Sequence, residues 1–357
     1  MSGKLQTEPE RILIVRLGAM GDVLHAMPAV AALRKAFPES DLTWLIERRW
    51  AELLQPELGE PTRVHGTPIV DAIGVVDTRL WRSHPTRTQT WREVRDVVRD
   101  LRATRFEVAT DFQGAIKSAL MAKASGASEI VGFASPRERM ATMWYTLQVQ
   151  TTAAHVIDQN LQLASAVARR PLEAESVDLA RSVAAEQWCD THLWTRGLTQ
   201  FAILNPGSGW GAKSWPGERY AEVAKRLQKV GLRSLINFGP GEEALAQGVA
   251  EASNGAAEAV NCNLAQLIAL TRRAALFIGG DTGPMHLAAA LRAPTVALFG
   301  PTDPARNGPY WTPSVILRSE RSVTSYRHVA QADPGLHSIT VDEVLAAAAQ
   351  LTGVAIG

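Results

Sequence analysis

The sequence predicts an α/β protein made of two doubly wound halves, each with a parallel sheet between layers of helices. Short apolar runs alternate with amphipathic stretches along most of the chain, and this alternation is typical of parallel sheets. The pattern stops near residue 169 and starts again at residue 201. The chain has 357 residues, more than one hydrophobic core usually holds, so two domains are expected.

The first half contains five apolar runs of the length of buried strands. They lie at residues 11–17, 42–46, 72–76, 106–110 and 129–133. Helices are expected at residues 23–37, 90–103 and 155–168, with further helices after Gly114 and Pro136. Residues 79–82, which read Arg-Leu-Trp-Arg, are expected in a loop before the 90–103 helix.

Residues 169–180 are the best candidate for a linker, because they combine Arg-Arg-Pro with mixed charges. An N-terminal domain is therefore expected over 1–168 and a C-terminal domain over 181–357. Further strands are expected at 201–205, 232–238, 275–278 and 295–299, and further helices at 217–230, from residue 242, at 264–273 and at 341–351. The last helix could pack back on the N-terminal domain. Two such domains are expected to face each other across a ligand cleft.

Composition excludes several classes of protein. Net charge is +1 at pH 7, so no global attraction to nucleic acid is expected. The two cysteines, Cys189 and Cys262, form no disulfide framework and fit a reducing cytoplasm. The first ten residues contain no apolar signal core, and no apolar run reaches the roughly 18 residues of a membrane span. No His or Cys group has metal-ligand spacing.

Four glycine-rich turns follow predicted strands. They lie at residues 18–22, 207–213, 239–242 and 279–283. Carboxyl-end loops of this kind face the ligand, and a helix that starts in one offers unpaired N–H groups to an anion. Asp281 or Thr282 can cap such a helix, and Gly283 lets a ligand approach its backbone. Lys213 is a cation on a glycine-rich loop, suited to pair with a phosphate.

Asp22 and the basic stretch after residue 78 are candidates for chemistry in the first half. Asp22 is a carboxylate at the end of the first strand, where it is either a helix N-cap or a base. His25 and His286 lie on apolar helix starts, where a structural role is the safer interpretation. Arg79 and Arg82 precede the 90–103 helix and are the better candidates for an anionic partner.

Four motifs together resemble one family of enzymes. They are Gly21-Asp22-Val23-Leu24-His25, the segment Asp111 to Ser118, Lys213-Ser214-Trp215-Pro216, and the segment Asp281 to His286. In this order they resemble the lipopolysaccharide heptosyltransferases of glycosyltransferase family 9, and within that family the heptosyltransferase I group. The resemblance covers nearly the whole chain, from about residue 11 to residue 304.

The resemblance implies the two-domain GT-B fold, with an N-terminal acceptor-binding and a C-terminal donor-binding domain. It implies an inverting transfer of heptose from ADP-heptose to a Kdo sugar of Kdo-lipid A, without a metal or other cofactor. Asp22 matches the general base and Lys213 a catalytic lysine at the donor diphosphate. The remaining matched positions are Ser208, Glu242, Asp281, Thr282, Gly283 and His286 for the donor, and Arg79, Arg82, Gln113 and Lys117 for the acceptor.

The expected protein is a cytoplasmic monomer, peripheral to the inner membrane. Three alternatives stay open. One is heptosyltransferase II or another family 9 enzyme with a different acceptor. A second is a sugar-nucleotide epimerase on the same fold, which needs no acceptor. The third is a nucleotide-sugar binding protein without activity.

Overall fold

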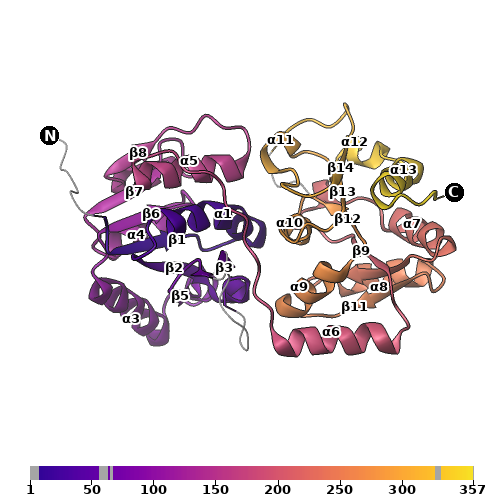
Figure 1. Cartoon of the computed structure of the whole chain (residues 1–357), viewed down its shortest axis with the longest axis horizontal. Coiled ribbons are helices and arrows are strands. Elements are labelled where there is room, and N and C mark those ends of the chain that lie inside the picture. The colour runs from indigo at the N-terminus through magenta and orange to yellow at the C-terminus, as the bar shows by residue number, and fades with distance from the viewer. Residues whose placement is uncertain (1–7, 56–62, 65–66, 326–330, 357) are drawn as a thin grey trace. The chain divides into compact units, whose positions relative to one another are not determined.

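The computed structural model describes residues 8–55, 63–64, 67–325 and 331–356. The chain divides into two compact units, Met1–Ala180 and Arg181–Gly357 (Figure 1). The boundary coincides with the end of the predicted 169–180 linker. Each unit is an α/β sandwich around one six-stranded sheet.

The first unit is a doubly wound parallel sheet, as predicted. Its strand order is β5-β2-β1-β6-β7-β8, and neighbouring strands pair in parallel. The strands are β1 (Arg11–Val15), β2 (Asp41–Glu47), β5 (Ala72–Val76), β6 (Val108–Asp111), β7 (Glu129–Phe133) and β8 (Leu147–Val149). Two short segments, β3 (Arg63–Val64) and β4 (Thr67–Pro68), pair separately and antiparallel.

Helices cover both faces of this sheet. The helical segments are α1 (Met20–Ala36), η1 (Arg48–Leu53), α2 (Thr78–Ser83), α3 (Thr88–Thr104), α4 (Ile116–Ala124), η2 (Arg139–Trp144) and α5 (Val156–Ala168). Leu101 of α3, Ala119 of α4 and Ala141 of η2 share one buried cluster with Leu13 and Val15 of β1. Helices α1 and α5 pack against each other.

The second unit repeats the design with the strand order β11-β10-β9-β12-β13-β14. The strands are β9 (Phe201–Asn205), β10 (Arg233–Asn237), β11 (Ala257–Val260), β12 (Leu276–Gly280), β13 (Thr295–Phe299) and β14 (Ser314–Arg318). The helices are α6 (Val183–Thr195), η3 (Gly211–Lys213), α7 (Gly217–Lys229), α8 (Glu243–Ala252), α9 (Leu264–Arg273), α10 (Gly283–Ala290), α11 (Pro304–Asn307), α12 (Pro334–Ser338) and α13 (Val341–Thr352).

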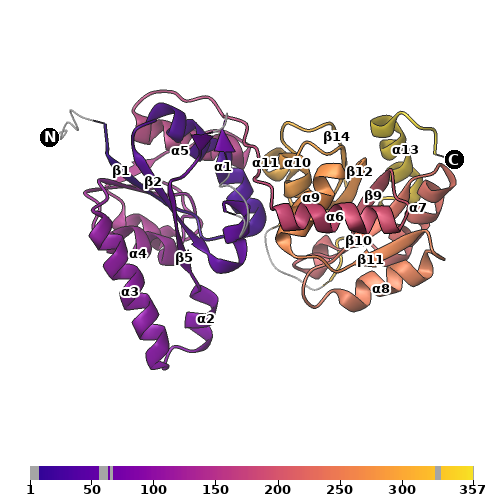
Figure 2. The same cartoon turned by 60° about the horizontal axis from the view of Figure 1, so that its bottom comes forward.

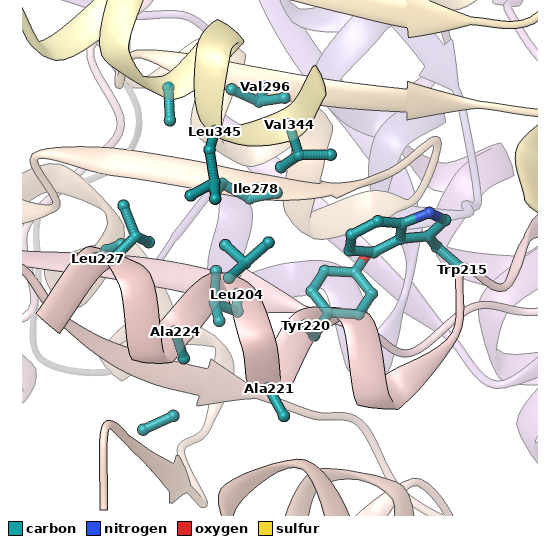
Figure 3. Close-up of a cluster of buried hydrophobic side chains, with 14 of the residues drawn as sticks. Leu204, Trp215, Tyr220, Ala221, Ala224, Leu227, Ile278, Val296, Val344 and Leu345 are labelled. Carbon is teal, nitrogen blue, oxygen red and sulfur yellow. The ribbon is translucent and has the colours of Figure 1, made fainter. Parts of the chain in front are cut away.

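Helices cover both faces of this second sheet (Figure 2), and a buried cluster lies on each face. Helices α6, α9 and α10 contribute Cys189, Leu270 and Met285 to one cluster. Helices α7, α8 and α13 cover the other face, where Leu204 of β9 contacts the apolar side of α7 (Figure 3). The terminal helix α13 buries Val344 and Leu345 in this cluster, so its apolar side packs on its own unit.

The structure corrects several predicted elements. Residues 79–82 lie in the short helix α2 and not in a loop, because the Asp77 carboxylate accepts a hydrogen bond from the Leu80 amide at 2.9 Å and caps the turn. The helix predicted after Pro136 is the 3₁₀ segment η2. Strands β8, β11 and β14 were not predicted, and all three are edge strands in which exposed or half-buried residues interrupt the apolar pattern.

The Leu204 cluster gives a test of the second core. Leu204 lies on the central strand β9 and is fully buried, so Leu204→Ala should lower the free energy of unfolding by about 2–5 kcal/mol. Leu245→Ala on α8 is the control, since Leu245 is 40% exposed and should cost much less. Urea unfolding followed by circular dichroism measures both. Equal losses for the two variants would contradict this account of the core.

Candidate functional site

In the second unit, hydrogen bonds of two asparagines at strand ends connect the glycine-rich turns that follow β9, β10 and β12. Strands β10, β9 and β12 are neighbours, so the loops that follow them leave the same edge of the sheet. The Asn205 side-chain amide donates to the Gly207 carbonyl at 3.0 Å and to the Thr282 hydroxyl at 3.4 Å. Its carbonyl accepts from the Asn237 amide at 2.8 Å. Sequence reasoning missed both asparagines, although each is the last residue of its strand and follows an apolar pair or run, which was the available signal.

Lys213, Asp281 and His286 form a compact charged cluster at this edge. The Lys213 Nζ lies 2.6 Å from Asp281 Oδ2 and 3.1 Å from the Asp281 carbonyl oxygen. His286 Nε2 lies 3.1 Å from Asp281 Oδ1. The side chains of Asp281 and Lys213 are only 5% and 15% exposed. Their charges are therefore poorly solvated, and the attraction between them is weakly screened by water. The three predicted residues therefore act as one unit.

The environment of Asp281 changes its pKa in two opposed ways. Burial raises the pKa of this carboxyl group. The hydrogen bond and charge of His286, with the Lys213 ammonium, outweigh burial and hold the pKa well below its usual range. Asp281 is therefore an anion in the folded protein at neutral pH, and it anchors the lysine.

Glu242 lies in the loop after β10, at the same carboxyl edge of the second sheet. Its Oε2 accepts a hydrogen bond from the Gly239 amide at 2.8 Å. The carboxylate also lies against Gly207, where an added Cβ would come within 2.1 Å of Oε2. A larger residue at position 207 would therefore require the Glu242 carboxylate to move. The Glu242 carboxylate comes from the β10 loop and lies against the β9 loop.

The other residues predicted to bind the sugar-nucleotide donor lie on the same loops. The Ser208 hydroxyl lies 2.6 Å from the Ser214 hydroxyl and 2.8 Å from the Trp210 carbonyl oxygen. Thr282 is the N-cap of α10, and Gly283 is its first residue. Pro284 has no N–H, and the Met285 amide donates to the Thr282 carbonyl at 3.1 Å, so the Gly283 amide is the N–H group that the first turn of α10 can offer to a ligand.

In the first unit, Asp22 lies inside α1 and not at its N-cap. Ala19 is the N-cap, and Asp22 Oδ2 accepts a hydrogen bond from its amide at 3.1 Å. Asp22 Oδ1 pairs with Arg16 Nη2 at 2.7 Å. The Arg16 side chain is 9% exposed and also donates to the Phe112 carbonyl at 2.5 Å. Sequence reasoning missed Arg16, which fixes the Asp22 carboxylate while leaving it 39% exposed.

Three of the residues predicted to bind the acceptor, Lys117, Arg79 and Arg82, lie on α4 and α2, which Lys117 connects. Lys117 of α4 donates to the Thr78 hydroxyl at 3.1 Å and lies 3.6 Å from the buried Glu47 carboxylate. Thr78 is the first residue of α2, which carries the exposed Arg79 and Arg82. Lys117 is therefore held beside the start of the arginine-bearing helix.

Gln113 and His25 have structural contacts in this unit. Gln113 Oε1 accepts from the Leu17 amide at 2.9 Å, which ties the loop after β6 to the end of β1. His25 is 6% exposed, its ring packs edge-on against His155, and its carbonyl accepts from Asn160. The structural interpretation of His25 fits these contacts.

Comparison with known proteins identifies the family. The model of glycosyltransferase family 9 (heptosyltransferase) matches residues 94–335. The chain belongs to this family. It is 29% identical to lipopolysaccharide heptosyltransferase 1 of Pseudomonas aeruginosa over 314 residues, which is 87% of this chain and 84% of the relative.

Solved structures agree on the fold. A family 9 glycosyl transferase from Veillonella parvula superposes with a TM-score of 0.79 at 22% identity, over 96% of this chain and 97% of its own. The E. coli heptosyltransferase WaaC, solved with ADP, superposes with a TM-score of 0.75 at 23% identity, over 96% and 99%. The two Rossmann-like units are thus of the GT-B type, as predicted.

Two features are absent from the described residues. No group of three His, Cys, Asp or Glu side chains there could hold a metal ion. None of the helices they form is long and apolar enough to cross a bilayer.

The lowered pKa of Asp281 predicts how stability depends on pH. Above the ordinary aspartate pKa of about 3.9 the carboxylate is charged in both states, and its pairs stabilise the fold fully. As pH falls below that value, the unfolded chain takes up the proton first, and this stabilisation is lost. The difference in thermal stability between the parent and Asp281→Asn should be constant from neutral pH down to about pH 4 and should shrink progressively as the pH falls further below that value. A difference that does not change with pH would contradict this pairing.

Proposed function

We propose that the protein transfers heptose from ADP-heptose to a Kdo residue of a Kdo-lipid A precursor, with inversion at the anomeric carbon, as a heptosyltransferase I. The observation that carries the proposal is the pairing of Lys213 with Asp281 at 2.6 Å. These residues belong to two motifs 68 positions apart that the resemblance assigns to one donor site. The named relatives over most of the chain support the same assignment.

In this proposal the donor binds at the carboxyl edge of the second sheet. The Lys213 ammonium and the start of α10, at Thr282 and Gly283, bind the diphosphate. Ser208 and His286 complete this contact, and Glu242 contacts the adenosine part. Fixed N–H groups and an ammonium are suited to charge that develops on a leaving ADP.

The first unit supplies the base and the acceptor contacts. Asp22 removes the proton from an acceptor hydroxyl while the oxygen of that hydroxyl bonds to the anomeric carbon of the heptose. The bond from the anomeric carbon to the phosphate oxygen breaks in the same step, and ADP leaves. Arg16 keeps the carboxylate in one orientation during this step. Arg79, Arg82, Lys117 and Gln113 bind the acceptor, whose Kdo carboxylate and lipid A phosphates are anionic.

The proposal includes a reaction without metal or other cofactor, carried out by a monomer at the cytoplasmic face of the inner membrane. Charge stabilisation then comes from Lys213 and the α10 backbone. A rate that is unchanged by a chelator would support this part. A rate that is lost with chelator and restored by a divalent cation would refute it without touching the choice of sugar.

The transfer itself is tested with purified protein, ADP-heptose and two acceptors, one ending in Kdo and one in heptosyl-Kdo. We expect ADP release and a heptosylated product only with the Kdo acceptor. Product only with heptosyl-Kdo would make the protein a heptosyltransferase II. Conversion of the sugar nucleotide without any acceptor would identify an epimerase, and donor binding without turnover would identify a binding protein.

Asp22 can be tested apart from the donor site. Asp22→Asn keeps the shape of the side chain and its bond to the Ala19 amide but removes the base, so we expect a rate loss of about 10²–10⁴-fold. ADP-heptose affinity, measured by calorimetry, should change little. His25→Ala is the control and should be much milder, although a cavity at this buried site will lower the melting temperature. A folded Asp22→Asn variant that keeps most of its rate would make Asp22 a structural residue.

A further inference from the structure

A group of exposed apolar side chains lies on the first unit, on η2 and α4. Met143 is 71% exposed, Met140 58% and Leu120 44%. Single exposed apolar residues are common, but several on packed elements mark an interaction surface. We call these three residues the Met140 patch. They are not among the residues assigned above to donor or acceptor.

The geometry of η2 places the two methionines on one side. A 3₁₀ helix has three residues per turn, so residues 140 and 143 lie one above the other. Ala141 of the same segment is fully buried, and Trp144 packs against the core cluster around Leu13 and Val15. The segment is therefore held from its inner side while both methionine side chains point outward.

Helix α4 packs directly against η2 and is fixed to it by a charge at its N-terminus. Glu138, just before η2, accepts a hydrogen bond from the Ile116 amide at 2.8 Å. Ala119 and Ala122 of α4 are buried in the same cluster as Ala141. Leu120 lies on the exposed side of this anchored helix. The Met140 patch is thus displayed by a rigid support.

Basic residues outnumber acidic ones in the segment that carries the patch. Residues 116–147 contain four of them, Lys117, Lys123, Arg137 and Arg139, and two acidic ones, Glu129 and Glu138. Glu129 pairs with Arg169 at 3.3 Å, and Glu138 caps α4, so both acids are already used. Lys123 is three residues from Leu120 on the exposed side of α4. An apolar centre with a cationic border is complementary to an anionic lipid surface, where apolar side chains enter the interface and cations contact headgroups.

We infer that the Met140 patch docks the protein on an anionic lipid bilayer. Met140, Met143 and Leu120 enter the interfacial layer, and Lys123 and Arg139 contact lipid phosphates. This inference rests on the proposed function, because an enzyme that modifies a lipid-anchored acceptor has to reach it at the membrane surface. No helix in the described part of the chain spans a bilayer, so a surface contact is what this architecture offers.

Vesicle flotation tests the inference with the full chain. The parent should bind vesicles of phosphatidylcholine with phosphatidylglycerol and bind pure phosphatidylcholine much less. Met140→Ser with Met143→Ser should weaken binding to the anionic vesicles by about tenfold or more, because the apolar contact is lost. Lys123→Gln with Arg139→Gln should reduce the dependence of binding on salt and on phosphatidylglycerol. Trp194→Ser is the matched control, since Trp194 is 83% exposed on α6 of the second unit.

The outcomes separate this inference from the proposed reaction. The methionine double variant should keep its melting temperature and its rate with a water-soluble, deacylated acceptor. Equal vesicle binding by the parent and this variant would overturn the docking surface and leave the reaction intact. The parent could instead fail to bind vesicles and form a dimer in light scattering, with the methionine double variant remaining monomeric. That result would overturn lipid docking and make the patch a self-association surface. If vesicle binding follows our expectation but no acceptor is modified, only the proposed reaction fails.

Discussion

Buried charges at the carboxyl ends of strands organise both units of this protein. A charge removed from water has to find opposite charges or hydrogen bonds, and here each one finds them on a neighbouring loop. The fully buried Asp111 ends β6 and accepts bonds from Tyr145, Ser118 and the Gln113 and Gly114 amides. Burial raises the pKa of this carboxyl group, and these four donors oppose the rise. The loop between β6 and α4 folds around that carboxylate.

The same constraint explains why the candidate catalytic groups are held so firmly. Arg16 is buried and bonds to both Asp22 and the Phe112 carbonyl, so it links α1 to the loop after β6. Asp281 is buried and takes its partners from the β9 loop and from α10. In each case one nearly buried ion positions a second, more exposed group. Such anchoring restricts the geometry of a side chain before any ligand arrives, which is what catalysis by orientation requires.

The sequence alone predicted the sheet architecture well and the contacts of the sites poorly. Central strands such as 201–205 and 129–133 were placed at their observed bounds, because buried parallel strands read as continuous apolar runs. Edge strand β11 (Ala257–Val260) was not predicted, because its two middle residues are only half-buried and the strand is not a continuous apolar run. The motifs indicated Lys213 and Asp281 separately. Their direct pairing could not be predicted, because it depends on β9 and β12 being neighbours although they are far apart in sequence.

In the proposed donor site, the Lys213–Asp281 pair also limits how a diphosphate is bound. An ammonium has three N–H donors. The Lys213 Nζ donates to the Asp281 carboxylate at 2.6 Å and to the Asp281 carbonyl oxygen at 3.1 Å. The Nζ also lies 5.3 Å from the centroid of the Trp210 ring, so the directions from which a ligand can reach this ammonium are restricted. Because Asp281 already neutralises part of the lysine charge, attraction to phosphate has to depend on these oriented donors more than on net charge. A site of this kind favours an anion of the right shape over one that merely carries the right charge.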